Sequence, residues 1–209
     1  MRTRGFIGAA VVMLAGIALA GCATVVSSGG GPAADDNGAL PRPSASGDVI
    51  AEGTVLQKGD GEPRLCLGNV ALSYPPQCGG PAIHGWDWAS VEQAETASNV
   101  TWGTYAVQGT WDGTAFTVTT APIPLSLYDP MAHPDPRLEG EPGSSDEAKL
   151  LRIQDDLQKS GDSAVLGTWT ANGYLFLSVI YDDGSVQEFV DERYGPDVVA
   201  VQSALRTAS

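Results

Sequence analysis

The amino-acid sequence predicts an α+β fold, in which a small N-terminal β-barrel-like module, similar to an OB-fold, precedes an α-β-β-α-β module. Three observations support this prediction. Short β-rich segments bounded by glycine turns fill the first part, and segments with a helical spacing of apolar residues fill the second. Six prolines between positions 120 and 143 separate the two parts.

Residues 1–21 have the charge and length of a secretory signal peptide. Arg2 and Arg4 precede an uncharged apolar run that is shorter than a membrane span. The segment Leu19-Ala20-Gly21-Cys22 resembles the bacterial lipobox. That resemblance implies cleavage before Cys22 and a diacylglyceryl group, with acyl chains such as palmitate, on its thiol. The expected product is a lipoprotein held outside the cytoplasmic membrane by its lipid. The alternative is an ordinary secreted protein that is cut near Ala20.

Residues 22–47 have the composition of a flexible tether. They combine runs of serine, glycine and proline with few large apolar side chains, so they cannot bury enough surface to offset the entropy of ordering. Without residues 1–21, which contain two arginines and no acid, 9 lysines and arginines remain against 25 acids, a balance of −16. Such a charge disfavours nucleic acid and anionic headgroups as partners.

Residues 48–125 are predicted to form the β-rich module. In segment 102–111 the alternation of side chains places Tyr105, Val107 and Trp111 on one face. Segment 90–98 has a short helical spacing and is expected to form a helix. The predicted strands are 49–57, 65–72 and 102–111, the last followed across a two-residue turn at Asp112-Gly113 by Phe116 and Val118.

Residues 126–143 are predicted to be a Pro-rich linker, and residues 144–209 the second module. Ser144 and Ser185 each stand three residues before a glutamate, which is the spacing of a capping box at a helix start. Gly161 is expected to end the first helix. Strands 165–171 and 174–181 are joined at Asn172-Gly173, a strong hairpin signal, and strand 198–201 follows the second helix. That helix would make its flanking strands parallel.

Two cysteines besides Cys22 are present, Cys66 and Cys78, and an exported protein meets an oxidising compartment. A disulfide between them would close a loop of 13 residues and stabilise the fold by about 3 kcal/mol. The alternative is a pair of free thiols in a metal or redox site, although the spacing is not C-x-x-C. Pro75 and Pro76 stiffen this loop.

Aromatic residues near this loop form the predicted binding surface, namely Tyr74, Trp86 and Trp88. Large aromatic side chains dominate many protein interfaces and also stack on sugars. The alternative is that the two tryptophans fill the end of the small barrel, because a small domain needs large side chains in its core.

No catalytic residues, metal site or cofactor are predicted. The sequence lacks a nucleophile elbow, a phosphate-binding loop and the histidine spacing of zinc sites. Asp182 and Asp183 precede a glycine and fit a turn better than a catalytic pair. The Pro-rich segment has two interpretations. It could be a solvated linker, or its side chains could gather around a hard cation, in which case the ligands would be Asp129, His133, Asp135 and Glu139.

Short patches of the chain are similar to a group of uncharacterised exported lipoproteins of actinobacteria. These patches are Leu65-Cys66-Leu67-Gly68, Ser73 to Pro81, Gly85 to Trp88, Gly109 to Gly113, Arg193-Tyr194-Gly195 and Ser203 to Arg206. The resemblance implies a compartment and an architecture but no activity.

The expected function is that of a membrane-anchored, non-catalytic binding or adaptor protein of the cell envelope. Its partners would be the lipid bilayer, through the anchor, and an envelope protein or glycan. One alternative is a hydrolase acting on the cell wall, in which two carboxyl groups would meet in a cleft. The other is an exported protease inhibitor that presents the loop between Cys66 and Cys78.

Overall fold

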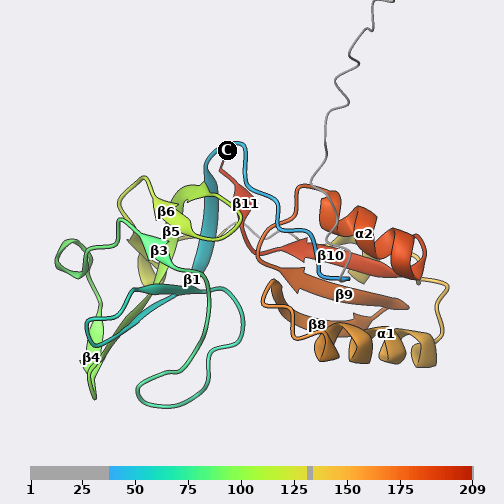
Figure 1. The fold of residues 1–209 in the computed structure, drawn as a ribbon, viewed down its shortest axis with the longest axis horizontal. Helices are drawn as coiled ribbons and strands as arrows, with labels where there is room; N and C mark the ends of the chain where they lie inside the picture. Colours follow the sequence, from blue (N-terminus) through green and yellow to red (C-terminus); the bar gives the residue numbers. More distant parts are fainter. Residues whose placement is uncertain (1–37, 131–133, 209) are drawn as a thin grey trace, which may run out of the picture. The chain divides into compact units, whose positions relative to one another are not determined.

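The structure is a computed structural model that describes residues 38–130 and 134–208. These residues form two β-sheets and two α-helices, so the predicted α+β class is confirmed (Figure 1). The first sheet is curled into a half-barrel and the second is small. None of the helices in the described ranges is long and apolar enough to cross a membrane.

The first sheet is built on two long antiparallel strands, β1 (Val49–Lys58) and β5 (Val100–Trp111). They pair from Val49 opposite Gly109 to Lys58 opposite Val100. Six shorter strands complete this sheet: β2 (Arg64–Cys66) and β11 (Arg206–Thr207) on β1, β4 (Glu95–Ala97), β6 (Phe116–Val118) and β7 (Ile123–Pro124) on β5, and β3 (Ile83–His84) on β6.

The core of this sheet follows the predicted alternation. Tyr105, Val107 and Trp111 are all buried, and they pack with Phe116 across the β5–β6 hairpin. The predicted strand 65–72 is much shorter, however, because only Arg64–Cys66 pairs with β1. Residues 67–78 leave the sheet as a loop instead.

The predicted helix over 90–98 is wrong. Trp88–Ser90 form a single 3-10 turn (η1), and Glu95–Ala97 form strand β4 beside β5. The two strands are joined at Ser98-Asn99, both with positive φ (48° and 61°), which is the backbone of a tight hairpin turn. In so short a segment, the helical spacing of apolar residues is a weaker structural signal than this hairpin turn.

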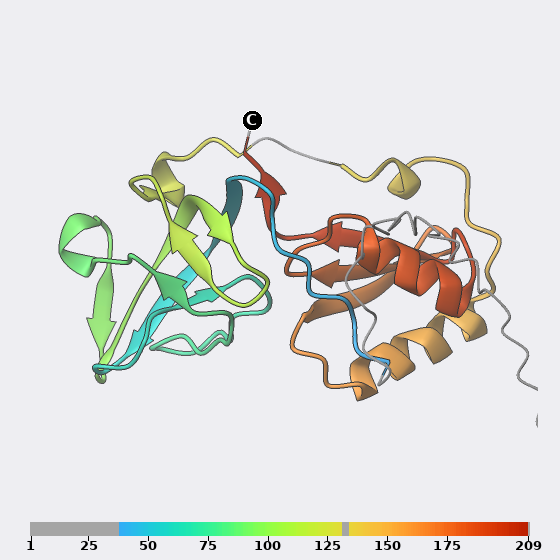
Figure 2. The same cartoon turned by 45° about the horizontal axis from the view of Figure 1, so that its top comes forward.

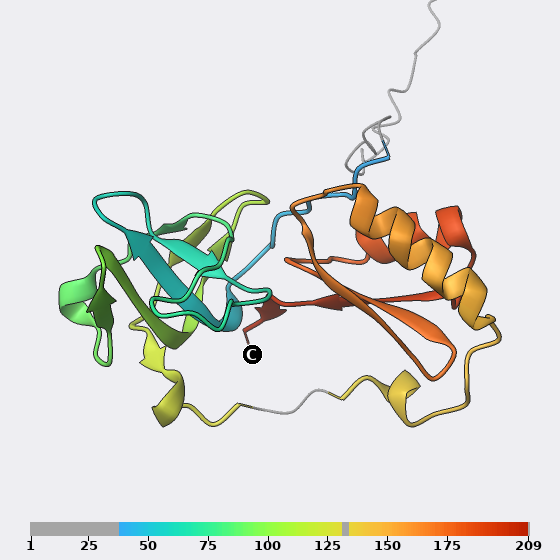
Figure 3. The ribbon, with the colours of Figure 1, turned by 90° about the horizontal axis from the view of Figure 1, so that it is seen from below.

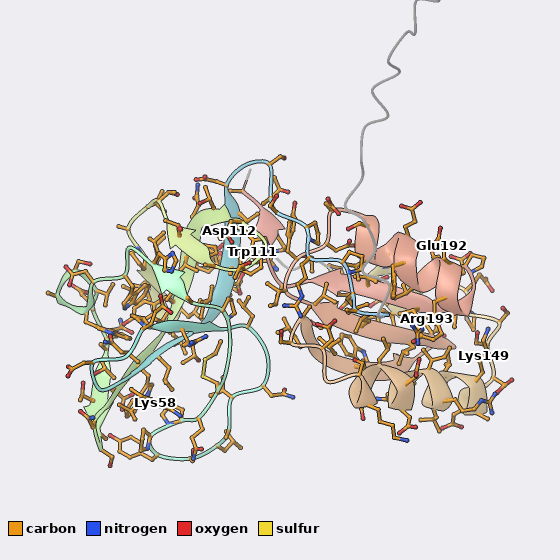
Figure 4. The ribbon with its side chains drawn as sticks, viewed as in Figure 1. Lys58, Trp111, Asp112, Lys149, Glu192 and Arg193 are labelled. Carbon is orange, nitrogen blue, oxygen red and sulfur yellow. A yellow bond between two sulfur atoms is a disulfide. The ribbon has the colours of Figure 1, made fainter. Side chains whose placement is uncertain are left out.

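The predicted two-residue turn at Asp112-Gly113 is also wrong. Trp111 pairs directly with Phe116, so four residues form the loop at the end of β5, where Figure 4 labels Trp111 and Asp112. The side chain of Asp112 accepts hydrogen bonds from the backbone amides of Thr114 and Ala115, each at 2.8 Å. These two bonds satisfy the amides of the longer loop and select it over the tight turn.

The second sheet confirms the predicted order α-β-β-α-β. Its elements are α1 (Glu147–Lys159), β8 (Val165–Ala171), β9 (Tyr174–Val179), α2 (Ser185–Tyr194) and β10 (Val199–Ser203). The strand order is β10-β9-β8, with β8 and β9 antiparallel and β9 and β10 parallel, as the crossover through α2 predicts. Asn172 and Gly173, at φ 47° and 76°, form the predicted hairpin turn.

Both helices pack on one face of this sheet, as Figure 3 shows. Their buried side chains meet those of β9 in one apolar cluster: Leu150, Ile153 and Leu157 from α1, Val186 and Val190 from α2, and Leu175, Leu177 and Val179 from β9. The predicted end of α1 is confirmed, since Gly161 has a φ of 64° just after the C-cap Ser160.

Neither predicted capping box forms. The N-cap of α1 is Asp146, whose carboxylate accepts from the amide of Lys149 at 2.8 Å, and not Ser144. At α2 the carboxylate of Asp182 accepts from the amides of Gly184 and Val186, both at 2.9 Å, and so replaces Ser185. A carboxylate is preferred at a helix start because it also meets the positive end of the helix dipole.

Segments from the two ends of the described chain contribute to both cores (Figure 2). Leu40 packs into the core of the second sheet, whereas Ala45 packs against the core of the first. After β10, Leu205 is buried in the core of the first sheet and β11 pairs with β1. The Pro-rich passage contains two 3-10 turns, η2 (Leu125–Leu127) and η3 (Pro136–Leu138). The predicted module boundaries stay a prediction.

Candidate functional site

The disulfide between Cys66 and Cys78 is present, as predicted, with 5.9 Å between the two Cα atoms. Cys66 is buried at the end of β2, next to the cross-strand pair Leu56 and Trp102. The bridge therefore fixes both ends of the loop against the apolar cluster that Leu56, Cys66 and Trp102 form on the first sheet.

Hydrogen bonds inside the loop fix its conformation. The amide of Ala71 donates to the carbonyl of Gln77 at 2.8 Å and joins the two arms. The amide of Ser73 donates to the carbonyl of Ala71 at 2.8 Å, which places Leu72 at the centre of a γ-turn. The Ser73 hydroxyl donates to the carbonyl of Pro75 at 2.9 Å. The loop is thus held by its own backbone.

Tyr74 attaches the tip of the loop to the sheet. Its ring meets that of Trp102 edge to face, with 5.3 Å between centroids and 88° between planes. Trp102 is buried, whereas 74% of Tyr74 is exposed. Tyr74 therefore contacts Trp102 with part of its ring and presents most of its surface to solvent.

Leu72 is the most exposed large apolar side chain among the described residues, at 108% of its reference area. It lies two residues from Tyr74, so the two apolar side chains share the tip of the loop. The sequence prediction missed Leu72 because it placed the residue at the end of a strand. An available signal was its position between two small residues inside a disulfide loop.

Trp86 and Trp88 pack inward and belong to a different group from Tyr74. Their rings meet edge to face at 5.3 Å, and Trp86 meets Tyr105 in the same way at 5.0 Å. Trp88 donates its indole N–H to the side chain of Gln57 at 2.5 Å. Within residues 38–130 and 134–208, Tyr74 has ring contact only with Trp102, so the three predicted aromatic residues do not form one surface.

Burial and hydrogen bonding perturb two groups of this sheet. Burial raises the pKa of Tyr105, whose hydroxyl donates to the carbonyl of Glu92 at 2.9 Å. The amides of Ala115 and Thr114 lower the pKa of Asp112, which is exposed. Both shifts follow from structural contacts within the sheet.

Acidic residues do not gather into a metal site within the described ranges, in which no group of three or more His, Cys, Asp or Glu side chains is close enough to hold an ion. Asp135 caps η3 and pairs with Arg137 at 3.4 Å, and His84 pairs with Glu62 at 3.2 Å. Asp182 and Asp183 bind backbone amides at the start of α2, as their interpretation as turn residues requires. Cys22 and His133 lie outside the described residues.

Comparison with known proteins gives no match among protein-family models, curated proteins or solved structures.

Proposed function

We propose that this chain is a non-catalytic binding protein of the cell envelope, anchored by lipid on Cys22, which presents the loop between Cys66 and Cys78 to a protein partner. The partner surface would be an apolar pocket that accepts Leu72. The support for the anchor is the sequence of residues 1–22, and the support for binding is the loop itself.

The exposed side chain of Leu72 carries this proposal. Burying a leucine is favourable by roughly 1.5–3 kcal/mol, and Leu72 obtains none of this within its own fold. The loop is already fixed by the disulfide and by the Ala71–Gln77 hydrogen bond. A partner would therefore gain the burial of Leu72 at little cost in ordering entropy.

The γ-turn at Leu72 favours a binding loop over the protease-inhibitor alternative. An extended segment pairs its backbone with the partner's strand, but here the amide of Ser73 is already bonded to Ala71. The hydrolase alternative gains no support from the cavity-bordering carboxylates of Asp156 and Asp162. Asp156 receives hydrogen bonds from Tyr194 and Arg193, and Asp162 from Arg42 and two backbone amides.

A photo-crosslinking amino acid at position 72, expressed in the native host, tests the binding proposal. We expect one specific envelope protein to be crosslinked from position 72. The same probe at position 127 is the control, because Leu127 is also exposed (68%) but lies on η2. In the unlabelled protein, Leu72→Asp should abolish co-purification of that partner and Leu127→Asp should preserve it. Equal labelling from both positions would contradict the proposal.

The anchor is tested separately with Cys22→Ser. We expect the wild type to incorporate labelled fatty acid and to fractionate with membranes, and the variant to do neither. Membrane association that survives the substitution would overturn the lipid anchor without affecting the role of Leu72.

A further inference from the structure

A second exposed aromatic residue, Trp169, lies on the outer strand of the small sheet. It pairs across β8 and β9 with Phe176, and the two rings stack at 5.3 Å with 10° between their planes. Phe176 is completely buried, whereas 39% of Trp169 is exposed. The stacking fixes the orientation of the indole, and the part not covered by Phe176 remains accessible.

The strand leaves open space directly beside this ring. Gly167 lies two residues before Trp169 and therefore on the same face of β8. A Cβ atom at Gly167 would meet nothing within 4 Å. Its partner on β9 is Ser178, whose hydroxyl is the nearest polar group of that row. On this face of the sheet, the indole ring of Trp169 is therefore followed by the open space at Gly167, and the hydroxyl of Ser178 lies on the strand beside that space.

These residues line a cavity of about 740 Å³, which is within the size range of small-ligand sites. Asn69, from the loop between Cys66 and Cys78, contributes a further uncharged polar residue to its wall. Thr168 and Gln158 also border the cavity, but Thr168 alternates with Gly167 and Trp169 and its side chain lies on the other face of β8, where its hydroxyl accepts hydrogen bonds from Gln158 at 3.0 Å and Gln154 at 3.3 Å.

The wall has one charged residue, Asp162, and its carboxylate is already used. It accepts from the amides of Leu40 (2.9 Å) and Ala164 (2.8 Å) and from Arg42 (3.0 Å). The ligand that fits is therefore uncharged, rich in hydroxyl groups and flat on one apolar face. The net charge of −14 also disfavours an anionic ligand.

We infer that this cleft binds a neutral glycan, with one sugar ring stacked on Trp169 and the next placed over Gly167 beside Ser178. The CH groups of a pyranose ring pack on an indole face, and its hydroxyls would meet the hydroxyl of Ser178 and the side chain of Asn69, which also lines the cavity. Leu72 does not line this cavity, although Leu67, Gly68 and Asn69 of the same disulfide loop do, so the inference does not rest on the proposed role of Leu72.

The test is a titration of the ¹⁵N-labelled full chain, carrying Cys22→Ser so that it is not lipidated, followed through its tryptophan indole signals by NMR. The chain has five tryptophans, and Trp169→Phe assigns the relevant signal. The probes are maltotriose, mannotriose and tri-N-acetylchitotriose, with trigalacturonate as the anionic comparison. We expect the Trp169 signal to shift with at least one neutral trisaccharide, at a Kd of about 1 mM or tighter.

Two variants keep the test independent of folding. Trp169→Ala should weaken binding by about 10-fold or more. Gly167→Val fills the open space with a residue that favours strands, so it should abolish binding while leaving the thermal stability unchanged or higher. Leu72→Asp should bind as the wild type does.

Three results would overturn the inference. They are the absence of a shift with all three neutral sugars, binding that persists in Gly167→Val, and tighter binding of trigalacturonate than of the neutral sugars.

Discussion

The side chain of Gln187 in α2 pairs with the backbone of Val201 in β10 as a neighbouring strand would. Its Oε1 accepts from the amide of Val201 at 3.0 Å, and its Nε2 donates to the carbonyl of Val199 at 2.9 Å. On the opposite edge, Gln154 of α1 donates to the carbonyl of Thr168 in β8 at 3.1 Å. Both outer strands of the small sheet are therefore capped by glutamines of the helices that cover it, which protects the edges from pairing with other chains.

The first prediction concerns Gln187→Glu. A carboxylate still accepts from the amide of Val201 but cannot donate to the carbonyl of Val199, and it faces Asp191, to which Gln187 also donates at 2.9 Å. We expect a loss of about 1–3 kcal/mol in the free energy of unfolding. Gln187→Ala should cost less, because it adds no repulsion.

Urea unfolding at neutral pH measures both Gln187 variants. Mild acidification, which protonates the new glutamate, should recover part of the stability of Gln187→Glu alone. A Gln187→Glu protein as stable as the wild type would show that the edge contact is unimportant.

Periodicity predicted the order of elements because it reports which face of a segment is buried. The parallel pairing of β9 and β10 follows from the length of the crossover through α2. The caps were predicted less well, since several polar residues stand near each helix start and any of them could accept from its first amides. Asp182 replaces Ser185 in this way, and only the geometry of the turn decides between them. A glutamine that caps a strand edge leaves no local pattern in the sequence.

The second prediction compares the two packed tryptophans of the first sheet. The Trp88 indole N–H is bonded to Gln57, whereas that of Trp86 is buried without a partner among the described residues. Trp88→Phe leaves the Gln57 oxygen without its donor, and Trp86→Phe removes an unsatisfied donor. We expect Trp88→Phe to destabilise the fold by about 1 kcal/mol more than Trp86→Phe does. Thermal unfolding of both variants checks this order, and the reverse order would contradict it.

The candidate site was predictable in part. The disulfide could be predicted from the number of cysteines together with the predicted export to an oxidising compartment. The separation of Tyr74 from Trp86 and Trp88 was not predictable, because nearness in sequence does not reveal which sheet face each ring packs on. Trp169 lies within the predicted strand 165–171, and the strand pattern alone does not reveal that its side chain stays partly exposed.

The third prediction concerns the bridge itself. Replacing Cys66 and Cys78 together by serine removes a covalent constraint on the unfolded chain and should lower the free energy of unfolding by about 3 kcal/mol. The wild type should melt at a lower temperature with reductant than without it, and the double variant should be insensitive to reductant. Equal melting of the wild type under both conditions would mean that the bridge does not stabilise the fold.

The fourth prediction concerns acid stability and Asp112. The amides of Ala115 and Thr114 lower the pKa of this carboxylate in the folded state. Because the folded pKa lies below the unfolded one, the charged form stabilises the fold above the unfolded value of about 4, and this contribution is lost as the pH falls through the folded pKa.

Asp112→Asn keeps an oxygen that can accept both bonds but does not titrate. We expect the stability of the wild type to fall more steeply than that of Asp112→Asn below about pH 4, measured by urea unfolding. Asp87→Asn is the matched control, since Asp87 also accepts a backbone hydrogen bond, from Ala89 at 2.9 Å, in an exposed turn. Parallel pH profiles for the wild type and Asp112→Asn would show that the bonds to Ala115 and Thr114 hold the loop without coupling it to the charge.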